Sequence, residues 1–163
     1  MVGGVVLDRS SVGSVTVAVA VNTQPFASVT VTVYSLPSVF TVTGGGNICS
    51  GGAGVHVGLS GSTTGISYKL YRGGSPVSSV TGTGSAIDFG IFTAAGTYTV
   101  IAMNLTTTCT NNMTGSAVIN VNPLPAAIAG TAYVCIGSST ILSDATGGGT
   151  WSDDNASVAT IGA

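Results

Sequence analysis

Apolar and polar residues alternate with a period of two along much of this chain. Between Ser14 and Val21 a valine occupies every odd position, and similar alternation returns from Ser28 to Tyr34 and from Ser116 to Asn122. Successive side chains of a strand point to opposite faces, so this pattern predicts half-buried β-strands. Frequent glycine turns and abundant valine and threonine extend the prediction to an all-β chain.

Two of the predicted strands end in the same way. Leu36-Pro37 follows the strand Ser28–Tyr34, and Leu124-Pro125 follows the strand Ser116–Asn122, 88 positions later. Proline has no backbone N–H to donate, so each Leu-Pro pair ends a strand and begins a linker. We therefore predict hinges at Leu36, Pro37, Leu124 and Pro125 in an array of similar domains.

The predicted strands divide the chain into three segments. Residues 37–122 hold roughly seven short strands between turns, and this number is typical of one complete β-sandwich. Gly73-Gly74 has the signature of a hairpin turn within it. Residues 1–36 hold two or three strands, including Gly4–Leu7, which are too few to bury a core alone. Residues 123–163 begin a further domain, with a strand starting near Val158 and Ile161.

Charged residues are scarce, at 5% of the chain. Glutamate is absent, and only Arg9, Lys69 and Arg72 carry positive charge. A nucleic-acid surface needs clustered Lys and Arg, so the composition argues against nucleic acid as a partner. No apolar run approaches the ~20 residues of a membrane helix, which argues against a membrane span. So few charges protect a free monomer poorly against association, and this favours a protein that works inside an assembly.

Residues suited to catalysis or metal binding are few. His56 is the only histidine, and its place between Val55 and Val57 predicts an exposed side chain rather than part of a catalytic set. The three cysteines lack a metal-ligand spacing such as C-x-x-C. Asp153 and Asp154 belong to no D-x-D-x-D-G calcium loop. We therefore expect no catalytic, cofactor-binding or metal-binding residues, and no enzyme activity.

Residues 37–122 resemble the PKD-like and Ig-like repeats of large surface proteins in gliding-type Gram-negative bacteria. The segments that carry this resemblance are Ile48–Gly52, Ile66–Tyr71, Ala94–Val100 and Asn122–Pro125. Tyr98 stands where such sandwiches often place a tyrosine corner. Residues 134–161 look like the first half of a bacterial Ig-like group 2 domain, and residues 4–17 look like its second half. The resemblance implies Ig-like β-sandwich repeats, with one complete domain flanked by two half-domains.

Residues 123–163 and residues 1–36 together amount to about one small sandwich. We predict that a neighbouring unit completes this split domain, either as a separate subunit or as the next part of a longer repeating polypeptide. Arbitrary boundaries of the sequence are the alternative interpretation. Completion gives a head-to-tail contact that propagates as a filament. The residues expected at this interface are Val5, Val15, Val17, Val31, Val33, Trp151, Val158 and Ile161.

The resembling repeats carry cysteines at the positions of Cys49 and Cys109, which implies a disulfide within the complete domain. A standard Ig strand order would place these two residues at opposite ends of the sandwich. On that topology Cys109 faces the preceding domain, where Cys135 of a neighbouring unit lies. Three outcomes stay open: a Cys49–Cys109 bridge, a Cys109–Cys135 bridge between units, and free thiols.

The sequence thus predicts a structural subunit or repeat of an extracellular filament or surface adhesin. No signal peptide follows Met1, so we expect a segment of a longer exported protein rather than a cytosolic protein. The expected partner is the chain itself, in a head-to-tail homopolymer or tandem repeats, with surface glycans as further candidate ligands. The alternative function is a carbohydrate-binding module of a secreted multidomain protein. Trp151, Tyr68 and Tyr71 are candidates for a sugar platform, but a core or interface role is favoured for them.

Overall fold

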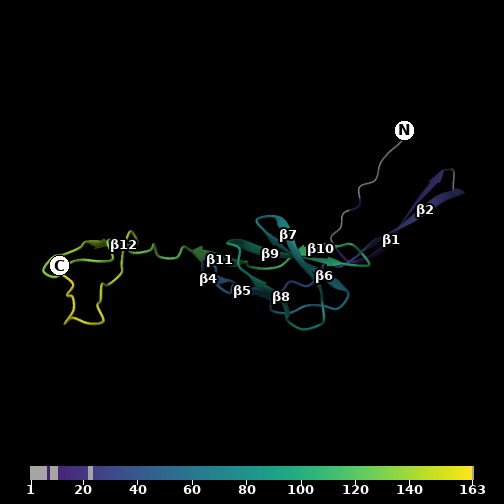
Figure 1. Ribbon diagram of the computed structural model, residues 1–163. Helices are drawn as coiled ribbons and strands as arrows, with labels where there is room; N and C mark the ends of the chain where they lie inside the picture. The colour runs from purple at the N-terminus through teal and green to yellow at the C-terminus, as the bar shows by residue number, and fades with distance from the viewer. Residues whose placement is uncertain (1–6, 8–10, 22–23, 163) are drawn as a thin grey trace. The chain divides into compact units, whose positions relative to one another are not determined.

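The computed structural model describes residues 7, 11–21 and 24–162. Every regular element in these residues is a β-strand, which confirms the all-β prediction. The chain divides into two compact units, with the boundary between Val121 and Asn122. Figure 1 shows the strands from the purple hairpin β1–β2 to the yellow-green β12. The described part has no helix that is long and apolar enough to cross a membrane.

Two sheets form a β-sandwich between residues 42 and 122. One sheet has the order β3–β5–β8, and these strands span Val42–Gly44, Val55–Leu59 and Ile87–Phe92. The other has the order β4–β11–β9–β6–β7, and β10 also pairs with β9. The strands of this second sheet span Gly46–Cys49, Ala117–Asn122, Gly96–Asn104, Ile66–Arg72, Ser75–Thr81 and Thr110–Asn112. This segment therefore has the strand content expected of a complete sandwich.

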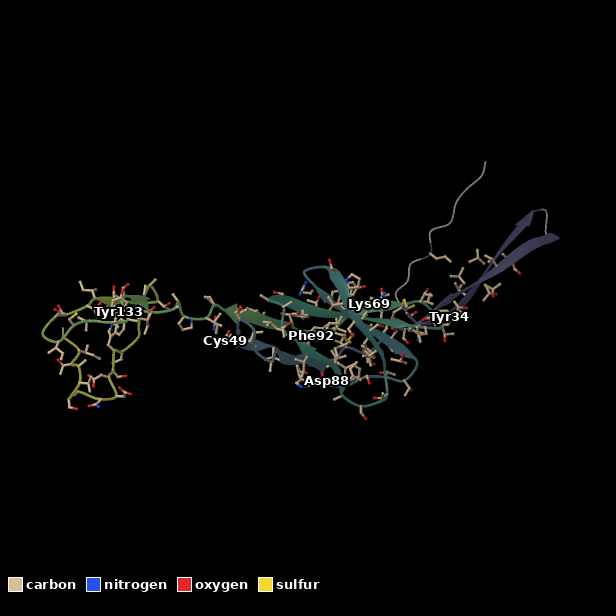
Figure 2. All side chains as sticks on the ribbon, viewed as in Figure 1. Tyr34, Cys49, Lys69, Asp88, Phe92 and Tyr133 are labelled. Carbon is tan, nitrogen blue, oxygen red and sulfur yellow. The ribbon has the colours of Figure 1, made fainter. Side chains whose placement is uncertain are left out.

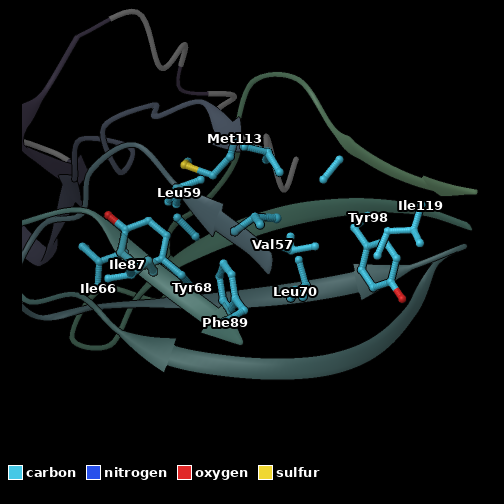
Figure 3. Packing of buried hydrophobic residues seen from close by; sticks show 14 residues of the cluster. Val57, Leu59, Ile66, Tyr68, Leu70, Ile87, Phe89, Tyr98, Met113 and Ile119 are labelled. Atoms are coloured by element: carbon cyan, nitrogen blue, oxygen red, sulfur yellow. The ribbon is translucent and has the colours of Figure 1, made fainter. Parts of the chain in front are cut away.

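The hydrophobic core lies between the two sheets (Figure 3). Strand β6 buries Ile66, Tyr68 and Leu70 and leaves Lys69 between them exposed, as a period of two requires. The core residues are Val42, Val57, Leu59, Ile66, Tyr68, Leu70, Ile87, Phe89, Tyr98, Val100, Ala102, Met113, Ala117 and Ile119. The alternation read from the sequence thus marks the inner faces of the central strands correctly.

Three glycines carry the chain from one sheet to the other. Gly44, Gly45 and Gly46 have φ angles of +92°, +82° and +144°, a region that glycine adopts far more readily than other residues. A Cβ on Gly44 would collide with the carbonyl oxygen of His56, and one on Gly45 would lie 2.6 Å from that of Val118. The chain can therefore leave β3 in one sheet and begin β4 in the other only because side chains are absent here.

Two local structures match the sequence predictions. The buried Tyr98 hydroxyl donates a hydrogen bond to the Ala94 carbonyl oxygen at 2.9 Å, which is the tyrosine-corner arrangement. Gly73 and Gly74 form a two-residue loop between β6 and β7, with φ angles of +54° and +86°. Two successive positive φ angles define a type I′ turn, whose twist suits a hairpin.

The N-terminal hairpin pairs β1 (Gly13–Val21) with β2 (Gln24–Val33) in antiparallel register. Its two faces differ in chemistry. Val15 lies opposite Val31 on one face, whereas the Ser14 and Thr32 hydroxyls on the other face hydrogen-bond at 3.0 Å. The predicted strand Gly4–Leu7 and the interface candidate Val5 lie outside the described residues, apart from Leu7.

Residues 122–162 carry little regular structure. Strand β12 (Ala129–Gly130) pairs with β13 (Leu142–Ser143), and every residue from 120 to 162 is exposed. The prediction of a strand starting near Val158 is wrong. Asn155 instead begins a turn, because its side-chain oxygen accepts the Ser157 N–H and its carbonyl accepts the Val158 N–H at 3.0 Å. Asparagine forms such local turns readily, and this preference overrides the apolar spacing.

Candidate functional site

The hairpin β1–β2 repeats the pairing of two core strands of the sandwich. In the sandwich Ile119 of β11 lies opposite Gly96 of β9, and in the hairpin Val33 lies opposite Gly13. Gly13 and Gly96 begin their strands with φ angles of +153° and +144°. Ile119 follows Val33 by 86 positions. The hairpin is therefore built like the β9–β11 pair at the same register.

One face of the hairpin carries Val15, Val17, Val31 and Val33, and we call it the valine face. In this register these four valines correspond to residues in the core of the sandwich. The corresponding pairs are Val15 and Tyr98, Val17 and Val100, Val31 and Ala117, and Val33 and Ile119. In the sandwich these side chains are at most 1% exposed, whereas Val15 is 46% exposed and the other three valines are half-buried. The hairpin thus presents a core-type face that no second sheet covers in the described residues.

The C-terminal segment repeats the beginning of the sandwich, again at a spacing of 86 positions. Gly130 follows Gly44 by 86 residues. A Cβ on Gly130 would collide with the carbonyl oxygen of Ile141, just as one on Gly44 would collide with that of His56. Strand β12, which Figure 1 labels, therefore ends with the same close approach to its partner strand as β3 does.

The same spacing links two turns that contain cysteine. Gly52 N–H donates to the Cys49 carbonyl oxygen at 2.9 Å, and Ser138 N–H donates to the Cys135 carbonyl oxygen at 3.0 Å. Each turn contains a glycine with a positive φ angle, which is +77° for Gly51 and +79° for Gly137. Cys135 therefore occupies the place in its segment that Cys49 occupies in the sandwich.

The correspondence is incomplete where the chain changes sheets. Thr131 and Ala132 stand at the positions of Gly45 and Gly46. A Cβ on Gly45 would lie 2.6 Å from the Val118 carbonyl oxygen, so the close approach that Gly45 makes to β11 cannot be repeated at Thr131. The glycine crossover is therefore specific to the sandwich.

The structural spacing differs from the 88 positions between the two Leu-Pro pairs. At a register of 86, Pro37 corresponds to Pro123 rather than to Pro125. The sequence held the signal for this register in the equal spacing of Cys49 from Cys135 and of Gly51 from Gly137. The repeated Leu-Pro motif hid this signal, because it suggests an alignment at 88 positions instead.

The proposed hinge residues behave differently from one another. Pro37 is buried, and the Asn111 side-chain amide donates to its carbonyl oxygen at 2.9 Å. Leu36, Leu124 and Pro125 are exposed. Pro37 therefore belongs to the sandwich, and any hinge before the sandwich lies ahead of it.

Of the three outcomes left open for the cysteines, the Cys49–Cys109 disulfide is contradicted by where the two residues lie. Cys49 ends β4, which lies beside β11 at the end of the sandwich where β9 begins. Cys109 precedes β10, which pairs with the opposite end of β9. The length of β9 separates them by about 25–30 Å at ~3.4 Å per residue, far beyond the ~7 Å Cα limit of a disulfide.

Trp151 forms part of a cavity in the C-terminal unit. The cavity has a volume of about 280 Å³ and is lined by Ile128, Asp144, Thr146, Gly147, Gly148, Gly149, Thr150 and Trp151. The Trp151 side chain is 45% exposed. The interface candidates Val158 and Ile161 are also exposed but do not line this cavity. Within this unit Trp151 therefore has no enclosed core to fill.

A polar pair lies on the outer surface of the β3–β5–β8 sheet. His56 Nδ1 and Asp88 Oδ2 are 2.6 Å apart, and both side chains are exposed. The Gly90 N–H donates a hydrogen bond to the Asp88 carboxylate at 2.8 Å, and this bond has the largest effect on the pKa of Asp88. Together with His56 it lowers the pKa of that carboxyl below its ordinary 3.8, although desolvation acts in the opposite direction.

The described residues contain no cluster of three potential metal ligands. The predicted exposure of His56 is confirmed.

No family model matches this chain, and no curated protein matches it either.

Proposed function

We propose that this chain is a structural unit of an extracellular filament or surface adhesin that assembles head to tail. In this proposal the hairpin β1–β2 of one unit covers residues 123–162 of the preceding unit and completes a split Ig-like sandwich. The observation that carries the proposal is the correspondence with the sandwich, at a spacing of 86 positions for β2 and the C-terminal segment and of 83 positions for β1. It makes the hairpin the counterpart of the last strands of a sandwich and makes residues 123–143 the counterpart of the first ones.

The exposed apolar surface supplies a driving force for this assembly. Burying a valine side chain fully is worth about 1.5–3 kcal/mol, so the hairpin valines together offer several kcal/mol. On the other segment Ile128, Ile141 and Leu142 are exposed, and Trp151 is half exposed. Strand addition also pairs backbone groups that a free edge leaves to solvent.

The test is whether the purified chain forms filaments that depend on the valine face. We expect Val31→Asp to abolish filaments in electron micrographs and to leave the thermal unfolding of the sandwich unchanged. A charge at this position would be buried without a partner in the completed domain. Thr32→Asp is the matched control, because Thr32 lies next to Val31 on the hydroxyl face.

Thr32→Asp should still form filaments. Equal loss of assembly in both variants would show that the effect is one of charge rather than of the valine face. A wild-type chain that stays monomeric up to its solubility limit would contradict head-to-tail completion altogether. Filaments whose axial repeat differs from two domains per chain would contradict the split-domain arrangement.

The cavity beside Trp151 supports a second candidate function, carbohydrate binding. Trp151 and Asp144 both line this cavity, and an exposed aromatic ring can stack on a sugar. Tyr68 cannot belong to a sugar platform, because it is buried in the core of the sandwich. A glycan array separates the two functions. Binding by monomers that Trp151→Ala abolishes would favour the carbohydrate-binding module, and filaments without sugar binding would favour the structural unit.

A further inference from the structure

We propose that Cys109 of one unit and Cys135 of the preceding unit form a disulfide that locks each joint of the assembly. This inference rests on the proposed head-to-tail completion and adds a covalent site to it. Both thiols are free in the structure, Cys135 is exposed and Cys109 is half-buried. Three observations on strand placement bring the two residues to the same joint.

The first observation places Cys135 in the completed domain. Cys135 corresponds to Cys49, which lies at the end of β4 beside β11. In the sandwich the Asn120 side chain donates to the Asn47 side chain at 2.9 Å, and this contact joins β11 to β4. Cys49 lies two residues beyond this contact, at the end where the chain leaves the sandwich.

The second observation identifies the residues that Cys135 meets. At the register of 86, Tyr133 takes the place of Asn47, and Tyr34 of the next unit takes the place of Asn120. Tyr133 is 84% exposed and Tyr34 is 53% exposed, so both are free to make this contact (Figure 2). Cys135 then lies two residues further along, beside Leu36 of the next unit.

The third observation places Cys109 near the same residue. The Asn111 amide donates to the Pro37 carbonyl oxygen at 2.9 Å, and Thr41 bridges Thr114 in parallel register. The segment that begins at Pro37 therefore runs alongside residues 111–114 in the same direction. Extended backwards, Leu36 comes next to the loop that holds Cys109. Cys109 of one unit and Cys135 of the preceding unit thus both lie next to Leu36. Neither cysteine belongs to a strand, so the spacing of a ladder does not hold them apart and their Cα atoms can approach within the ~7 Å that a disulfide allows.

Forming this disulfide needs an oxidant, and the oxidant that we propose is a small-molecule disulfide such as oxidised glutathione. The Cys135 thiolate attacks one sulfur of oxidised glutathione and displaces a glutathione thiolate. The Cys109 thiolate then attacks the Cys135 sulfur and displaces the second glutathione thiolate. Two protein thiols lose two electrons, and one glutathione disulfide becomes two glutathione thiols that carry the two protons. The exposed Cys135 is the better first nucleophile because a thiolate must reach the oxidant.

The experiment uses the full chain with Cys49→Ser, so that only the two relevant thiols remain. Oxidised glutathione should convert it into a ladder of multimers on a denaturing gel, and a thiol reductant should collapse the ladder to monomer. Adding Cys109→Ser or Cys135→Ser should abolish the ladder. Mixing these two double variants should give dimers only, because each retains one half of the bond.

Several outcomes would overturn the proposal. A faster-migrating monomer without a ladder would show that the bond forms within one chain. Dimers of either double variant alone would show unspecific oxidation. Electron micrographs of the same samples separate this inference from the proposed function. Filaments without a ladder would refute the disulfide and leave the assembly intact, whereas neither filaments nor a ladder would refute both.

Discussion

At some positions of this protein the surrounding backbone determines which residue type can be present. Gly44 shows this most clearly, because both its positive φ angle and the nearby His56 carbonyl exclude a side chain. Gly130 repeats the close approach in the C-terminal unit. At both positions the backbone of one strand lies where a Cβ would be, so glycine is required by packing and not only by chain flexibility.

We expect Gly44→Ala to destabilise the sandwich by more than about 2 kcal/mol, since alanine adds a steric collision to the cost of a left-handed backbone. Gly65→Ala is the matched control. Gly65 has a φ angle of +79°, and no atom lies within 4 Å of the place that its Cβ would take, so only the backbone cost of about 1 kcal/mol applies. Urea unfolding of both variants measures the difference, and equal losses would contradict the collision.

Asp88 allows a prediction about pH. Its folded pKa is lowered below 3.8, first by the Gly90 N–H and then by His56. A lowered pKa means that the ionised carboxylate favours the folded state above pH 3.8, and that this contribution is lost as the pH falls through the folded pKa. Carboxyl NMR titration should give a value below 3.8. His56→Ala should leave part of the shift, because the Gly90 N–H remains; a full return to the ordinary value would contradict this order of causes.

At the scale of elements, turn geometry fixes the strand pairings. The Gly73-Gly74 turn sets the register in which Arg72 faces Ser75, and the alternation of β6 then points Tyr68 and Leu70 into the core. In the hairpin β1–β2 the same alternation separates a valine face from a hydroxyl face. A shift of one residue would exchange these faces, so register and burial depend on each other.

We expect Gly73→Asn to stabilise the sandwich by about 0.5 kcal/mol. Asparagine tolerates the φ angle of +54° and has fewer unfolded conformations than glycine. Gly73→Val should be destabilising instead, because a β-branched residue fits a left-handed backbone poorly. Thermal unfolding of the two variants compares them at one site. Stabilisation by valine would show that the turn is not type I′ in solution.

At the scale of the whole molecule, the distribution of apolar surface separates the sandwich from its flanks. The sandwich buries a cluster of large side chains between two sheets, whereas no residue from 120 to 162 is buried. With charged residues at only 5%, the surface has little charge with which to attract or repel a partner. The proposed head-to-tail assembly should therefore depend on apolar contacts and backbone pairing.

We expect filament formation to be nearly independent of sodium chloride, because salt screens interactions between charges and few charges are present. Sodium sulfate should promote it, since excluded salts strengthen the burial of apolar surface. Light scattering across a salt series measures both effects. A steep loss of assembly with sodium chloride would point to ion pairs that the proposed interface does not contain.

The sequence by itself determined the strand class and the inner faces of the strands, because a period of two fixes which side chains share a face. It also located the Gly73-Gly74 turn, because a turn depends on local chemistry, whereas the tyrosine corner at Tyr98 was implied by the resemblance to Ig-like repeats. Only the tertiary structure decided between the open placements of Cys49 and Cys109, showed that Asn111 holds Pro37, and showed that β1 pairs with β2 in the register of β9 and β11. These depend on which strands pair across long stretches of chain, and periodicity does not encode that choice.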